Sequence, residues 1–164
     1  MNVSATPASR RAWLLVGALV LAGCATPRRA PVDAPLWTGR LSVRVDATPV
    51  QSFGAGFELQ GGPIAGELRL SSPLGNTLAR VVWSPAGAEL HQGSAVTRRG
   101  SLDDLTTELA GAPLPIEALF GWLQGRGDTA AGWQADLSRH ADGRITARRD
   151  APLPRAELRV VFER

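Results

Sequence analysis

The sequence predicts a mainly β domain of the α+β class, in which a curved antiparallel sheet surrounds at least one helix. Three observations lead to this prediction. Apolar and polar residues alternate with period two over much of residues 37–92 and again from residue 133 onward, which is typical of half-buried strands. Short Gly- and Pro-rich turns separate these stretches and favour antiparallel pairing. Two helical patterns lie between the two groups of strands.

The first group consists of short strands joined by tight turns. In the first strand, Leu41 and Val43 face one side and Arg44 faces the other, as expected for a strand with one buried face. The later strands repeat this alternation. The predicted strands cover residues 37–45, 53–59, 66–71, 76–83 and 88–92.

Two helices follow. Ser101 and Asp104 stand at the positions of a capping box with a shorter acid, and leucines at helical spacing continue the pattern through residues 102–109. The second helix, PIEALFGWLQ, covers residues 115–124 and is apolar on nearly every side. Such a helix should be surrounded by protein, and a curved sheet surrounds a helix better than a flat one does.

Strands resume after residue 132 and complete the domain. They are predicted at residues 133–139, 144–149 and 156–163. The Asp142-Gly143 step between the first two is a strong hairpin signal. We therefore expect one domain, with no internal repeat, over residues 37–164.

Residues 1–23 are predicted to be a signal peptide. Two Arg precede an apolar run at residues 12–22, which is too short for a bilayer crossing of about 20 residues. The run ends in Leu21-Ala22-Gly23-Cys24, which resembles the bacterial lipobox, whose cysteine receives diacylglycerol. An ordinary signal peptide with a chance cysteine is the alternative. The paired Arg also fit a twin-arginine signal, although the general export route is favoured.

Residues 24–36 are interpreted as a lipidated cysteine followed by a Pro-rich tether. Diacylglycerol and an N-linked acyl chain on Cys24 would together provide stable membrane anchoring, which a single acyl chain does not. Ala25 after the cysteine is consistent with sorting to the outer membrane. No other cofactor is expected.

The composition excludes several kinds of chemistry. The 164 residues include 18 basic residues, all of them Arg, against 15 acidic residues. Lysine-dependent catalysis and a phosphate-loop lysine are therefore impossible. One Cys and two His exclude an intrachain disulfide and a multi-Cys or multi-His metal site. Loss of residues 1–23 leaves 16 basic against 15 acidic residues, a net charge of +1. Because this excess of positive charge is so small, the pI of about 10.8 does not indicate a nucleic-acid partner.

Catalytic motifs are missing from the sequence. It has no G-x-S-x-G or H-E-x-x-H pattern. A Ser–His–Asp triad is not excluded by composition, but His91 and His140 lie beside polar strand edges or turns, which favours a structural role. Asp103 and Asp104 favour the start of a helix. We therefore expect a protein that is not an enzyme.

The apolar residues allow two interpretations. They form either an ordinary packed core or the wall of an incompletely filled cavity that accepts acyl chains. The loop Pro73-Leu74-Gly75 fits an ordinary core less well, because it carries a Leu at a turn where a polar residue is expected. The inward positions considered for the cavity are Phe53, Phe57, Leu68, Leu70, Trp83, Ile116, Leu119, Phe120, Leu123 and Trp133.

Several segments, in order along the chain, resemble the family of LolB, the outer-membrane receptor of the Lol lipoprotein-sorting pathway. The most specific are the S-P-L-G loop and the segment G-x-P-L-P-I…W-L-x-G. The full set is Cys24, Trp37-x-Gly39-Arg40-Leu41, residues 66–77, residues 102–106, residues 111–125 and Gly132-Trp133.

The resemblance implies an incomplete antiparallel β-barrel closed on one side by helices. Its apolar cavity would receive the acyl chains of triacylated lipoproteins from the periplasmic carrier LolA. The protein, a monomer facing the periplasm, would then place them in the inner leaflet of the outer membrane. The family's protruding loop leucine corresponds to Leu74. The compact region after Trp133 leaves the number of strands open. The alternatives are a structural or assembly lipoprotein without acyl cargo and, less favoured, a lipoprotein hydrolase.

Overall fold

The computed structural model describes residues 34–110, 112–130 and 132–163. They form one nine-stranded antiparallel sheet in the order β6-β5-β4-β3-β2-β1-β9-β8-β7. The two outermost strands do not pair with each other, so the sheet is open. The strands are β1 (Leu36–Val45), β2 (Gln51–Gly61), β3 (Gly66–Ser71), β4 (Thr77–Ser84), β5 (Gly87–Gln92), β6 (Ala95–Arg99), β7 (Trp133–Asp136), β8 (Arg144–Arg149) and β9 (Ala156–Glu163).

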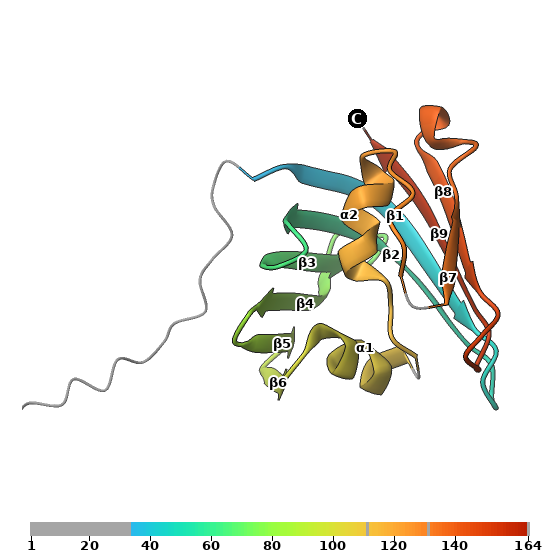
Figure 1. Cartoon of the computed structure of the whole chain (residues 1–164). Coiled ribbons are helices and arrows are strands. Elements are labelled where there is room, and N and C mark those ends of the chain that lie inside the picture. The colour runs from blue at the N-terminus through green and yellow to red at the C-terminus, as the bar shows by residue number, and fades with distance from the viewer. Residues whose placement is uncertain (1–33, 111, 131, 164) are drawn as a thin grey trace, which may run out of the picture.

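The sheet curves around the two helices, α1 (Leu102–Ala110) and α2 (Ile116–Leu123). Figure 1 shows α2 on the hollow side, between β2–β6 on one side and β7–β9 on the other. The predicted mainly β fold with two helices is therefore confirmed, and the open sheet is consistent with an incomplete barrel.

The long strands β1 and β9 hold the two halves of the sheet together. Burial alternates along both of them, and Leu41, Val43 and Val160 are at most 8% exposed. Gly39 lies where the two strands come close, because a Cβ on it would stand 2.1 Å from the Val161 carbonyl oxygen. A larger residue at this position would force the strands apart.

The second helix is surrounded by protein, as its sequence predicts. Every residue of α2 except Glu117 is buried, and the Trp122 indole donates a hydrogen bond to the Asp128 carbonyl at 2.7 Å. One half of the capping box predicted for the first helix is present, because the Asp104 amide donates to the Ser101 hydroxyl at 3.0 Å.

Two elements differ from the sequence prediction. Strand β6 was not predicted; it pairs with β5 after a turn at Gly93, whose φ is +57°. The predicted strand at 133–139 was too long, because β7 ends where the Ser138 amide donates to the Asp136 carboxylate. A 3₁₀ turn, His140–Asp142, then precedes Gly143 in the left-handed conformation, so the hairpin connection is longer than a two-residue turn.

The outer face of the sheet carries cross-strand ion pairs. Arg80 on β4 contacts Glu67 on β3 at 2.8 Å, and Arg69 contacts the same carboxylate at 3.1 Å. The hydrogen bond from Arg80 and the charges of both Arg hold the pKa of Glu67 below its ordinary value. Arg98 lowers the pKa of Glu89 in the same way, and Arg148 and Arg159 lower that of Glu157.

Because of these ion pairs, we expect the folded protein to lose stability in acid. A carboxylate whose pKa is lower in the folded state contributes stability above its ordinary pKa of 4.5 and loses that contribution as the pH falls below it. We expect the melting temperature to fall between pH 6 and pH 3, and Glu67→Gln to reduce this dependence. Glu117→Gln is the control, since Glu117 forms no ion pair within the described residues. Equal pH dependence in all three proteins would contradict the prediction.

Candidate functional site

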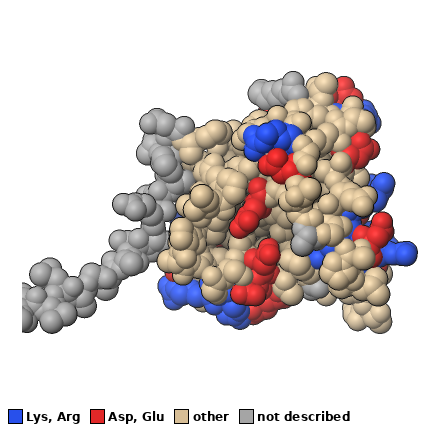
Figure 2. Space-filling model, in the orientation of Figure 1, with Lys and Arg blue, Asp and Glu red and all other residues tan. Residues whose placement is uncertain are grey.

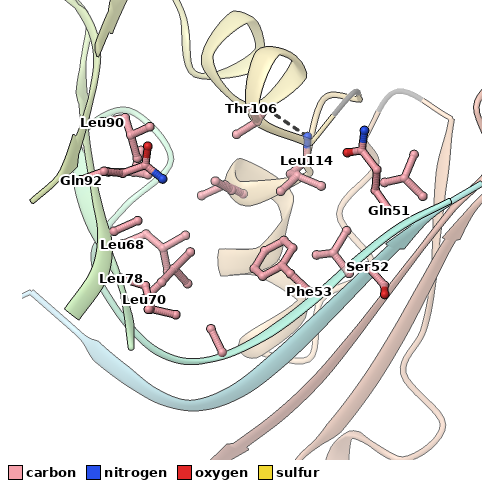
Figure 3. A pocket seen from close by; sticks show the side chains of 16 residues that line it. Gln51, Ser52, Phe53, Leu68, Leu70, Leu78, Leu90, Gln92, Thr106 and Leu114 are labelled. Atoms are coloured by element: carbon pink, nitrogen blue, oxygen red, sulfur yellow. Dashed lines mark hydrogen bonds between the residues drawn. The ribbon is translucent and has the colours of Figure 1, made fainter. Parts of the chain in front are cut away.

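An apolar cavity of about 330 Å³ lies between the hollow side of the sheet and the helices. Figure 3 shows Leu68, Leu70 and Leu90 on one side of it, with Phe53 and Leu114 facing them. The volume is at the low end of the range of about 300–1,000 Å³ for ligand pockets. The lining residues are Val43, Val45, Gln51, Ser52, Phe53, Ala55, Leu68, Leu70, Leu78, Ala79, Val81, Leu90, Gln92, Thr106, Leu114 and Ile116.

Among the described residues, no charged side chain lines this cavity. Three of its four polar residues, Gln51, Ser52 and Gln92, are exposed and therefore stand at its open side. The fourth, Thr106, is buried, but its hydroxyl donates to the Asp103 carbonyl and accepts from the Leu114 amide. The interior therefore offers a ligand apolar contact and no unsatisfied hydroxyl, which suits hydrocarbon.

A second, fully apolar hollow of about 40 Å³ adjoins the cavity. It shares six lining residues with the cavity, among them Phe53 and Ile116, and adds Leu41, Pro115, Leu119 and Leu158. The shared side chains form a common wall, so their movement would join the two spaces.

The link between α1 and α2 contributes one wall of the cavity through Leu114. It is held by hydrogen bonds to the Pro113 carbonyl from the Trp133 indole at 3.3 Å and from the Arg149 guanidinium at 3.4 Å. Arg149 is only 1% exposed and forms no ion pair within the described part of the chain. Burial lowers the pKa of its guanidinium, and its other hydrogen bond goes to the Pro154 carbonyl.

The structure brings together half of the residues predicted for a cavity wall. Phe53, Leu68, Leu70 and Ile116 line the cavity, and Leu119 lines the adjoining hollow. The other five lie elsewhere in the core: Phe57, Trp83, Phe120, Leu123 and Trp133.

The wall also contains residues that sequence reasoning missed, notably Leu78, Leu90 and Leu114. The pairing of β3 with β4 shifts register at Leu70/Ser71. At this irregularity the adjacent residues Leu78 and Ala79 both line the cavity, which strict alternation along a strand would not allow. Leu90 could have been found from the alternation in its strand.

The loop between β3 and β4 holds Leu74 away from the protein. The Gly75 amide donates to the Ser72 carbonyl at 2.9 Å, and the Ser72 amide donates to the Asn76 carbonyl at 2.8 Å. Pro73 suits the second position of this turn, and Gly75 adopts a φ of +83° that favours glycine. Leu74 is 88% exposed, so the turn fixes an apolar side chain in solvent.

The histidines and the acidic residues are the side chains that a catalytic or metal-binding role would use. The two histidines do not line the cavity; His91 contacts Glu89 at 3.3 Å, and the His140 ring contacts the Leu123 carbonyl at 3.0 Å. Figure 2 shows a surface over the helices that is mostly uncharged, with scattered carboxylates and with Arg mainly toward its edges. Within the described residues, no three His, Cys, Asp or Glu side chains are grouped as a metal site.

Two features bear on attachment to a membrane, the cysteine at position 24 and the length of the helices. Cys24 lies outside the described residues, so its lipidation stays a prediction. Neither helix in the described part of the chain has the length and apolar character needed to span a membrane.

Comparisons with known proteins agree on one family. The family model described as outer membrane lipoprotein LolB matches residues 36–161. The LolB of Chromobacterium violaceum is 36% identical, over 71% of this chain and 68% of the relative. The LolB of Thiobacillus denitrificans is 37% identical over 68% and 63%, and that of Bordetella petrii is 32% identical over 92% and 90%. The chain therefore belongs to the family of outer-membrane lipoprotein LolB.

Proposed function

We propose that this protein accepts triacylated lipoproteins from the periplasmic carrier LolA by binding their acyl chains, and inserts them into the inner leaflet of the outer membrane. Membership of the LolB family gives it a role in lipoprotein localisation at the outer membrane. The single observation that carries the finer proposal is the open cavity, whose lining in the described part of the chain contains no charged side chain.

The energetics of acyl transfer require such a cavity. Each CH₂ removed from water contributes about 0.8 kcal/mol, so a lipoprotein with three acyl chains needs an apolar host at every step. Transfer between a carrier and a receptor of higher acyl affinity needs no nucleotide and no covalent step. The receptor acts as a monomer, held at the membrane through Cys24, and works by binding and release without catalysis.

The cavity and the Leu74 loop divide this task. The cavity holds the acyl chains, and widening it toward the adjoining hollow would accommodate more of them. The exposed Leu74 enters the membrane surface and starts the release of the cargo. Neither Pro73 nor Gly75 needs to contact cargo, because their part is to fix the turn.

A transfer assay tests the proposal. LolA loaded with a fluorescent triacylated lipoprotein is mixed with the full chain in the presence of liposomes, and cargo on carrier, receptor and liposomes is separated over time. We expect cargo to appear on the receptor before the liposomes, and only when the receptor is present. Cargo that stays on the carrier would contradict the proposal and favour a structural or assembly lipoprotein without acyl cargo.

A further inference from the structure

The first half of β2 has a free edge. Residues 51–55 pair with Leu41–Val45 of β1 on one side, but the ladder with β3 ends at the pair Gly56–Ser71. In the described residues, no backbone hydrogen bond outside the β1 ladder reaches this stretch. Backbone N–H and C=O groups therefore face away from β1 over about 17 Å of strand.

This edge lacks the features that usually protect strand edges. Soluble proteins cover such edges or place charges and prolines on them to prevent pairing with another chain. Strand β6, at one end of the sheet, carries Arg98 and Arg99, and β7 at the other end has only four residues. The stretch Gln51-Ser52-Phe53-Gly54-Ala55 contains neither a charge nor a proline, and residues 51–54 are exposed.

The free edge lies at the mouth of the cavity. Gln51, Ser52, Phe53 and Ala55 all line it, and Figure 3 shows Gln51 and Phe53 directed into it from β2. When the acyl chains of a cargo lipoprotein lie in the cavity, its polypeptide must extend out of the cavity through this mouth. Both the N-acyl and the thioether-linked chains belong to its first residue, so the rest of its polypeptide starts beside the edge.

We propose that residues 51–55 bind the polypeptide immediately after the acylated cysteine of the cargo by β-strand addition. This inference rests on the proposed function, because it places the acyl chains in the cavity. Strand addition uses main-chain hydrogen bonds, which different cargo sequences can all supply. The cavity and the edge thus recognise two features that lipoproteins share, acyl chains and a backbone.

The test uses four ligands and the full chain carrying Cys24→Ser, which cannot acquire a thioether-linked lipid of its own. One ligand is tripalmitoyl-cysteine amide without a peptide, and the second carries five further uncharged residues. The third and fourth carry N-methyl groups on alternate amides of that peptide, in opposite phases. Affinity is measured by displacement of a fluorescent fatty acid, and amide exchange of residues 51–55 by mass spectrometry.

We expect the peptide-bearing ligand to bind about tenfold more tightly than the cysteine amide, which is the gain that one or two net hydrogen bonds give. It should also slow exchange in residues 51–55. Only one of the two N-methylated ligands should lose both the tighter binding and the slower exchange, because alternate amides point to opposite sides of a strand.

Equal affinity of all four ligands, or equal losses in the two methylated ligands, would overturn the inference while leaving the acyl-chain receptor intact. Failure of all four to displace the fatty acid would overturn the proposed function itself, together with this inference.

Discussion

A Leu74→Glu variant is expected to take cargo from the carrier normally and to lose at least about tenfold in delivery to liposomes. Leu74 is 88% exposed, so the substitution should change the free energy of unfolding by no more than about 0.5 kcal/mol. Burying a Leu side chain in lipid contributes about 1.5–3 kcal/mol, and a carboxylate in its place opposes insertion. Cargo should therefore accumulate on the receptor.

The protein supplies a matched control for this result. Ile64 is 76% exposed in the turn between β2 and β3, at the opposite end of β3 from Leu74. Ile64→Glu places the same charge at a similarly exposed apolar position and should deliver cargo at the normal rate. Equal loss in both variants would indicate a general effect of surface charge, and normal delivery by Leu74→Glu would remove this loop from the insertion step.

Much of the fold follows from local sequence patterns. The alternation in β1 and β9 identified strands with one buried face, and the sequence of α2, which is apolar except for Glu117, identified a helix enclosed by protein. These elements were predictable because their burial is periodic and nearly complete. The SPLG loop could be identified because it places an apolar residue at a turn, where a polar residue is expected.

The elements that were missed depend on tertiary contacts. Strand β6 has only Val96 as a large apolar residue, and its pairing with β5 and the ion pair between Arg99 and Glu108 on α1 are not visible locally. Strand β7 ends early because the Asp136 side chain accepts the Ser138 amide. A polar residue in an alternating pattern does not reveal such a bond.

The cavity wall was only half predictable for a related reason. Alternation shows which face of a strand is buried, but not whether a buried side chain meets another side chain or an empty space. Trp83 and Phe120 meet edge to face with ring centroids 6.0 Å apart, and the Trp83 indole donates to the Gly62 carbonyl. They belong to the packed core, whereas the smaller Ala79 and Leu78 face the cavity.

An Ala79→Trp variant should lose at least about tenfold in cargo acceptance from the carrier. Ala79 is 7% exposed on β4, opposite Leu70, and lines the cavity. An indole at this position would fill much of the roughly 330 Å³ available to acyl chains. Overpacking a filled core costs about 1–3 kcal/mol, but here the added ring has space, so the fold should be retained. Acceptance is measured as cargo leaving LolA, with thermal unfolding as the check on folding.

Ser42→Trp provides the control, because Ser42 is exposed on the outer face of β1 and does not line the cavity. It adds the same ring without reducing the cavity and should accept cargo normally. The two variants of the proposed site should also fail at different steps: cargo stays on the carrier with Ala79→Trp and on the receptor with Leu74→Glu. Normal acceptance by a folded Ala79→Trp would show that the acyl chains bind outside this cavity, even if Leu74 is still required for delivery.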